Sequence, residues 1–175
     1  MKYPTVDAVI ETPQGSRNKY KYDEETGLYK LSRVLPSGSV YPFSFGFVPD
    51  TLSEDGDPLD VLVVADEPVP VGCVVASRLI GVLEAEQDKG EGPKRNDRLI
   101  AVAAQSRDHE DLTSWRQVNA NLRKEIEHFF VSTHEQVGEK FKILGWQGPP
   151  TARRALDHAR EAFRRKHQSR KKRHA

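Results

Sequence analysis

Patterns of β type occupy roughly the first hundred residues of the chain, and helical periodicity occupies the last sixty. The β-type runs are short and apolar and are bounded by turn residues such as Pro36, Ser37 and Gly38. Because strands and helices are segregated along the chain rather than alternating, the sequence predicts an α+β fold with a mainly β core. The expected strands are residues 6–11, 20–22, 28–34, 61–65, 74–83, 98–103 and 140–146.

Two helices are expected in the second half of the chain, because apolar residues recur there at intervals of three and four. The first should run from about residue 115 to residue 134, with Ser114 as its N-cap. The second should follow Pro149 and Pro150, with Thr151 as its N-cap.

An aromatic residue stands at every second position of the segment Tyr41, Phe43, Phe45 and Phe47. Since side chains two apart along an extended chain share a face, the four rings should lie on one side of it. We interpret this stripe as facing the core.

The chain is long enough for one well-packed domain, residues 1–175, with 37% of its residues hydrophobic. No apolar stretch approaches the roughly 20 residues that cross a bilayer, and the N-terminus has no apolar core for a secretory signal. We therefore expect a soluble, cytoplasmic protein without membrane contact. Cys73 is the single cysteine, and we expect it to be a small buried apolar residue.

The C-terminal segment 164–175 is strongly basic. It carries seven of the 27 Lys and Arg residues and none of the 26 Asp and Glu residues, so residues 1–163 have a net charge of −6. Nucleic-acid binders usually carry basic residues on the folded surface, so nucleic acid is not the expected partner. The segment is best interpreted as a solvated helix end or tail, with polyanion binding or a subunit contact as the alternative.

A loop with three carboxylates precedes the apolar run 61–64: Asp55, Asp57 and Asp60 stand within six residues. Gly56 allows the backbone to turn, and Pro58 stiffens it. Crowded carboxylates repel one another unless a cation lies among them, and oxygen ligands suit Mg²⁺, Mn²⁺ or Ca²⁺. On local sequence alone, a solvated acidic turn is the alternative.

Basic residues on neighbouring strands indicate which class of substrate the protein could bind. Lys19 and Lys21 are two residues apart and share a face of their predicted strand, and Arg33 lies on the next one. Metal ions together with Lys or Arg neutralise the oxygens around phosphorus during phosphoryl transfer. The combination therefore indicates phosphoryl chemistry, whereas each lysine taken alone would be an ordinary surface residue.

These residues resemble those of the family I soluble inorganic pyrophosphatases, over about residues 9–146. The hexapeptide 55–60 and the apolar run behind it are close to the family's signature. The supporting matches are Glu11, Lys19, the turn 23–27, Arg33, Tyr41, Pro42, Gly46, the run 51–53, Phe129 and Phe130.

The resemblance implies a five-stranded OB-like closed barrel with two C-terminal helices packed on it. It also implies hydrolysis of pyrophosphate to two orthophosphates by a metal-bound hydroxide, without a covalent intermediate. The implied cofactor is Mg²⁺, with Mn²⁺ as a possible substitute. The implied assembly is a homo-oligomer, a hexamer if the chain is of bacterial type.

Carried over by position, Asp57 would be the general base, while Asp55 and Asp60 would bind the activating metals, with Asp60 bridging two of them. Glu11 would bind or orient a further metal or its water. The substrate-binding set would be Lys19, Lys21, Arg33 and Arg98, the last standing where the family usually has Lys. In the hairpin 84–98, Asp88 and Asp97 would be metal ligands, with Asn96 as the alternative to Asp97.

Four positions depart from the family's pattern. Lys21 stands in place of a Glu and Phe45 in place of a Tyr, while Thr133 and His134 replace a Tyr and Lys pair. Two alternatives therefore stay open beside pyrophosphate hydrolysis: a related phosphohydrolase with another substrate, and a non-catalytic OB-like module that binds phosphate or nucleic acid.

Overall fold

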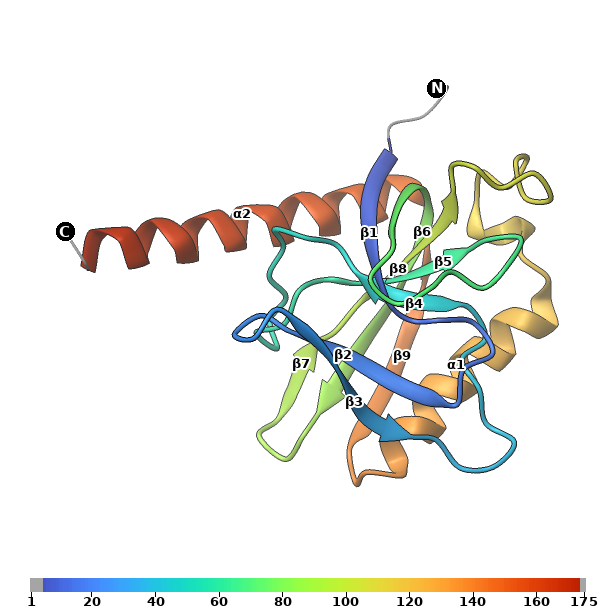
Figure 1. The fold of residues 1–175 in the computed structure, drawn as a ribbon, viewed down its shortest axis with the longest axis horizontal. Coiled ribbons are helices and arrows are strands. Elements are labelled where there is room, and N and C mark those ends of the chain that lie inside the picture. Colours follow the sequence, from blue (N-terminus) through green and yellow to red (C-terminus); the bar gives the residue numbers. More distant parts are fainter. Residues whose placement is uncertain (1–4, 174–175) are drawn as a thin grey trace.

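The computed structural model describes the backbone of residues 5–173 and the side chains of residues 5–169 (Figure 1). Strands dominate the first two thirds of the chain, and two α-helices follow, so the predicted mainly β core with two helices is confirmed. The elements are β1 (Thr5–Thr12), β2 (Asn18–Asp23), β3 (Leu28–Val34), β4 (Ser44–Phe47), β5 (Asp60–Val64), β6 (Val74–Asp88), β7 (Pro93–Arg95), β8 (Arg98–Ala103), the 3₁₀ helix η1 (Trp115–Gln117), α1 (Ala120–Glu135), β9 (Lys140–Gln147) and α2 (Pro149–Arg173).

Five strands form a closed ring of hydrogen-bonded neighbours. The order is β1, β4, β5, β8 and β6, and β6 pairs back with β1. Strands β5 and β8 are parallel, and the other neighbours in the ring are antiparallel. The 15-residue β6 is long enough both to close the ring and to extend beyond it. Its first part pairs with β1, and its last part pairs with β7 and β9.

Apolar side chains fill the space on both faces of the central strands. All six residues of β8 are buried, as expected for a strand covered on both sides. On one side, Ala152, Leu156 and Ala159 of α2 pack against the ring. On the other side, Ile126 of α1 packs with the aromatic residues that precede and form β4.

The two helices begin at other residues than predicted. Ser114 caps η1 rather than a long helix, and Asn119 caps α1, its side chain accepting from the Asn121 N–H at 2.8 Å. Helix α2 already starts at Pro149, so the prediction of Thr151 as its N-cap is wrong. Proline fits this position because the N–H groups of a first helical turn need no partner within the helix.

The aromatic stripe faces the core only in part. Tyr41, Phe43 and Phe45 are buried, whereas Phe47 is half-buried and stacks on Tyr22 at 5.9 Å between ring centroids.

The prediction that Cys73 is buried is wrong, because it lies exposed in the turn that precedes β6. The basic C-terminal segment continues α2 as far as Arg173, and the helix projects well beyond the ring (Figure 1). None of the helices in the described part of the chain is long and apolar enough to cross a membrane.

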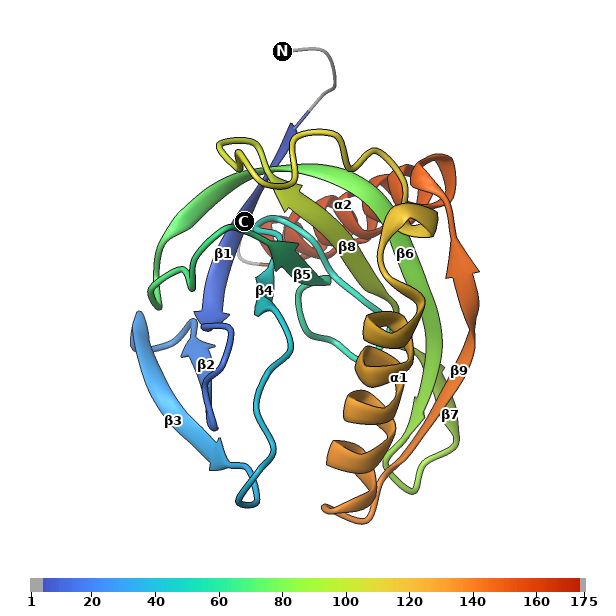
Figure 2. The same cartoon turned by 90° about the vertical axis from the view of Figure 1, so that its right-hand side faces the viewer.

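Strands β2 and β3 form a separate two-stranded sheet beside the ring. Side chains of β1 hold this hairpin in place: the Tyr20 N–H donates to Thr12 Oγ1 at 3.1 Å, and the Tyr22 N–H donates to Glu11 Oε1 at 2.7 Å. Figure 2 shows the hairpin on one side of β4 and α1 on the other.

Candidate active site

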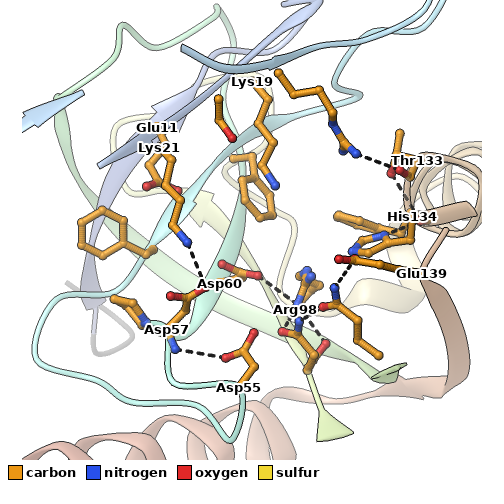
Figure 3. Close-up of a pocket in the computed structure, with 18 of the residues that line it drawn as sticks. Glu11, Lys19, Lys21, Asp55, Asp57, Asp60, Arg98, Thr133, His134 and Glu139 are labelled. Atoms are coloured by element: carbon orange, nitrogen blue, oxygen red, sulfur yellow. Dashed lines mark hydrogen bonds and ion pairs between the residues drawn. The ribbon is translucent and has the colours of Figure 1, made fainter. Parts of the chain in front are cut away.

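A cavity of about 550 Å³ lies where the hairpin, the loop 55–60 and α1 face one another. Eight of the ten site residues predicted from sequence line it, although they are spread over the first hundred residues (Figure 3). They are Glu11, Lys19, Lys21, Arg33, Asp55, Asp57, Asp60 and Arg98.

The other two predicted residues, Asp88 and Asp97, are not among those that line the cavity. Asp88 Oδ1 accepts from the backbone of Gly90 and Gly92 at 2.8 and 3.0 Å, so it shapes the turn. Asp97 pairs with Arg95 at 2.9 Å. The cavity is lined instead by Asn96, which is buried.

The loop 55–60 presents its carboxylates through a compact local structure. Gly56 has a φ of 90°, which favours glycine, and its N–H donates to the Ser53 carbonyl at 3.1 Å. The Ser53 N–H in turn donates to the Asp57 carbonyl at 2.8 Å, and the Asp57 N–H donates to Asp55 Oδ1 at 3.2 Å. Asp55 and Asp57 therefore project from a closed turn.

Asp60 is the first residue of β5 and lies opposite Arg98, the first residue of the parallel β8. The two side chains form an ion pair at 2.9 Å, and the Arg98 side chain is only 4% exposed. Its guanidinium lies 5.3 Å from the ring centroids of both Phe130 and Phe141. Desolvation raises the pKa of Asp60, and the charges of Arg98 and Lys19 act in the opposite direction.

Polar side chains continue from Arg98 across the floor of the cavity. Arg98 donates to Asn96 Oδ1, and the Asn96 amide donates to Gln87 Oε1. The Gln87 amide then donates to Glu139 Oε2 at 2.6 Å. Gln87 and Glu139 were missed by the sequence analysis; the signal for Gln87 is a polar residue at an inward position of an apolar strand.

The cations reach the cavity from the hairpin and from β8. Burial lowers the pKa of Lys19, although the charge of Asp60 acts against this. Lys21 Nζ lies 3.0 Å from Asp57 Oδ2, and Arg33 Nη1 donates to the Thr133 carbonyl at 3.0 Å.

The residues that depart from the expected pattern all line this cavity. Phe45 is buried among other aromatic rings, so it brings no hydroxyl to the cavity. Thr133 directs its hydroxyl back to the Phe129 carbonyl at 2.7 Å. His134 stacks on Phe141 at 4.5 Å, with Nδ1 2.6 Å from the Phe130 carbonyl. This wall therefore presents aromatic rings and an already bonded hydroxyl, where the family's pattern would place hydroxyl and ammonium groups that can bind phosphate oxygens.

The His134 ring gives the protein a predictable sensitivity to acid. Burial lowers the pKa of His134 to about 4. The unfolded chain therefore takes up this proton first, so the stability that depends on neutral His134 is complete above about pH 6.5 and is lost as the pH falls toward 4. Between pH 7 and pH 5 we expect the free energy of unfolding to fall by about 2 kcal/mol from this residue.

Urea denaturation at the two pH values measures this change. Glu11, whose pKa burial raises to about 7, contributes in the opposite direction in every variant, so the comparison is with wild type. Between pH 7 and pH 5, His134→Phe, which can keep the stacking on Phe141, should lose about 2 kcal/mol less free energy of unfolding than wild type. His128→Phe, on the exposed side of the same helix, is the matched control and should lose as much as wild type. An equal pH dependence in wild type and His134→Phe would contradict the assignment.

The carboxylates of the cavity suit a hard divalent cation. Burial raises the pKa of Glu11 to about 7 and also raises that of Asp60, so an added cation would stabilise both ionised groups. In the part of the chain that the structure describes, however, no three acidic, His or Cys side chains are arranged so that they could hold a metal ion. Asp57 and Asp60 are instead paired with Lys21 and Arg98.

Comparison with known proteins gives one consistent result. The family model for inorganic pyrophosphatase matches residues 8–164. An inorganic pyrophosphatase from Geobacillus stearothermophilus is 40% identical over 152 residues, 87% of this chain and 90% of the relative. One from Methanosarcina mazei is 38% identical over 155 residues, 89% of each. The crystal structure of inorganic pyrophosphatase from Thermus thermophilus matches with a TM-score of 0.84 at 36% identity, covering 94% of both chains.

Proposed function

The chain belongs to the family I inorganic pyrophosphatases and hydrolyses inorganic pyrophosphate, and we propose that it does so in the cavity beside the loop 55–60. The observation that carries the proposal is the meeting of two sets of charges in one cavity. Carboxylates come from β1, the loop and β5, and cations come from β2, β3 and β8. This is the arrangement that a metal complex of a polyanion requires.

We assign Asp55, Asp60 and Glu11 as the carboxylates that hold Mg²⁺ together with phosphate oxygens of the substrate, since these side chains are not arranged to hold a metal ion on their own in the described part of the chain. Mn²⁺ is a possible substitute. When bound, Mg²⁺ would neutralise phosphate oxygens and make a water molecule more acidic. Asp57, which projects from the same closed turn, accepts the proton of the attacking water. With a water molecule as the nucleophile, the reaction needs no covalent intermediate on the protein.

Lys19, Lys21, Arg33 and Arg98 form the substrate-binding set. Lys19 and Arg33 are cross-strand partners in the hairpin, so they address the same region of the cavity. Asp60 and Asn96 hold the Arg98 guanidinium in place, which makes it a rigid donor to the leaving phosphate.

The requirement for a divalent cation is tested by measuring phosphate release from pyrophosphate. We expect release in millimolar Mg²⁺, loss of release in excess EDTA, and recovery when Mg²⁺ is restored. Release that continues undiminished in EDTA would contradict the assignment of the carboxylates. Near-ultraviolet circular dichroism in EDTA should show that the fold persists without metal, so that loss of release reports on the site.

The finer structural expectations are part of the same proposal. We infer that the ring of five strands is an OB-like closed barrel, that residues 1–175 act as one domain, and that the chain forms a cytoplasmic homo-oligomer, a hexamer if of bacterial type. Light scattering on the eluted protein tests the assembly, and a monomer at micromolar concentration would contradict it.

A further inference from the structure

Lys21 stands at an unusual place for a substrate-binding cation. It lies on β2, on the wall of the cavity that faces the loop 55–60, and its ammonium contacts Asp57 Oδ2 at 3.0 Å (Figure 3). Asp57 is the carboxylate to which we assign the proton of the attacking water. One cation thus already occupies the carboxylate on which the proposed reaction depends.

The ion pair between Lys21 and Asp57 is more easily broken than the ion pair between Arg98 and Asp60. The side chains of Lys21 and Asp57 are 54% and 46% exposed, so water screens their attraction. Arg98 and Asp60 are 4% and 21% exposed, and Arg98 is held further by Asn96 and by two aromatic rings. A divalent cation approaching the loop therefore displaces Lys21 more readily than Arg98.

A second partner is within reach of Lys21 once Asp57 is released. Lys19 and Lys21 both line the cavity from the same strand, and the charges of Asp60 and Arg33 already act on Lys19 there. Lysine has a long, flexible stem with a compact charge, so a small rotation carries its ammonium from a carboxylate to a phosphate oxygen.

We propose that Lys21 is an exchangeable cation that neutralises Asp57 in the empty cavity and moves to the phosphate oxygens when Mg²⁺ and pyrophosphate bind. This inference rests on the proposed function. It makes the binding of metal and substrate interdependent. Lys21 lowers the affinity for Mg²⁺ while the cavity is empty, and it no longer does so once a pyrophosphate group is bound. Because binding linkage is reciprocal, Mg²⁺ strengthens the binding of the pyrophosphate group by the same factor.

The test is direct calorimetric titration of Mg²⁺ into the full-length protein, without and with saturating imidodiphosphate, a pyrophosphate analogue with a nitrogen bridge. We expect Lys21→Met to bind Mg²⁺ about threefold to tenfold more tightly than wild type in the empty protein, because the competing cation is gone. With imidodiphosphate present, this advantage should disappear or reverse. Lys21→Arg, which keeps a cation, should retain the interdependence.

Lys30 provides the matched control. It lies directly across from Lys21 on β3 and pairs with Asp23, but it is not among the residues that line the cavity. Lys30→Met removes the same charge from the same hairpin and should leave the Mg²⁺ affinity within about twofold of wild type. Equal tightening in Lys30→Met and Lys21→Met would overturn the proposal in favour of a general field effect, and unchanged affinity in Lys21→Met would overturn it outright.

Asp60→Asn separates this inference from the function on which it rests. Loss of Mg²⁺ binding in Asp60→Asn with wild-type affinity in Lys21→Met refutes only the role of Lys21. Undiminished Mg²⁺ binding in Asp60→Asn refutes the proposed metal site itself.

Discussion

Replacing Asp57 by asparagine should lower kcat for pyrophosphate by about 10²- to 10⁴-fold, the usual effect of removing a positioned general base. Asparagine keeps the shape of the side chain but cannot accept the proton of the attacking water. The fold should be unaffected, because the Asp57 side chain is 46% exposed and its ion pair with Lys21 is exposed as well. Initial rates of phosphate release in saturating Mg²⁺, with a melting curve for each protein, measure both quantities.

Glu54→Gln is the matched control for this variant. Glu54 is an exposed carboxylate three residues before Asp57 and accepts from the Arg95 N–H, but it does not line the cavity. It should retain a kcat within about twofold of wild type, since surface substitutions away from a site have small effects. Turnover in Asp57→Asn equal to that of Glu54→Gln would rule out Asp57 as the base.

Replacing Arg98 by methionine should have the largest effect on stability, about 3 to 5 kcal/mol in the free energy of unfolding. Methionine fills a similar volume between Phe130 and Phe141, but it leaves Asp60 without its ion-pair partner and Asn96 without its donor. The unpaired carboxylate carries most of the cost, because the Asp60 side chain is only 21% exposed. Urea denaturation at pH 7 measures the change.

Two further variants identify the cause. Arg98→Lys keeps the charge and should recover much of the stability. Arg165→Met removes an exposed partner of Glu161 and should cost less than about 1 kcal/mol. A cost below about 1 kcal/mol for Arg98→Met itself would show that the pair with Asp60 does not stabilise the fold.

The strand pattern could be predicted from the sequence because alternation and turn residues are local signals. Strands β3 and β8 begin and end at the predicted residues. The start of α1 could not be predicted, because Ser114 and Asn119 are both good capping residues five positions apart. Which of them starts the long helix depends on how the chain packs between them.

The acidic loop and its facing cations were also within reach of the sequence, since each belongs to a short, continuous segment. The hairpin 84–98 was not, because register decides which side chains face inward and a shift by one residue reverses them. The cavity-facing Arg98 could have settled the question. Asn96 and Asp97 lie between β7 and β8, and Asn96, two residues before Arg98, is buried and lines the cavity with it, whereas Asp97 pairs with Arg95. Glu139 depends on the long-range pairing of β6 with β9, for which the sequence has no local signal.

The β2–β3 sheet is separate from the ring, so the hairpin can open locally without disrupting the ring. Its two strands carry one wall of the cavity, the loop 55–60 and α1 carry the facing wall, and side chains of β1 hold the hairpin to the ring. A ligand that touches both walls therefore acts as a crosslink between them. Backbone amides of the hairpin should exchange with deuterium faster than those of β8 in the free protein, and ligand binding should slow them far more than it slows those of β8.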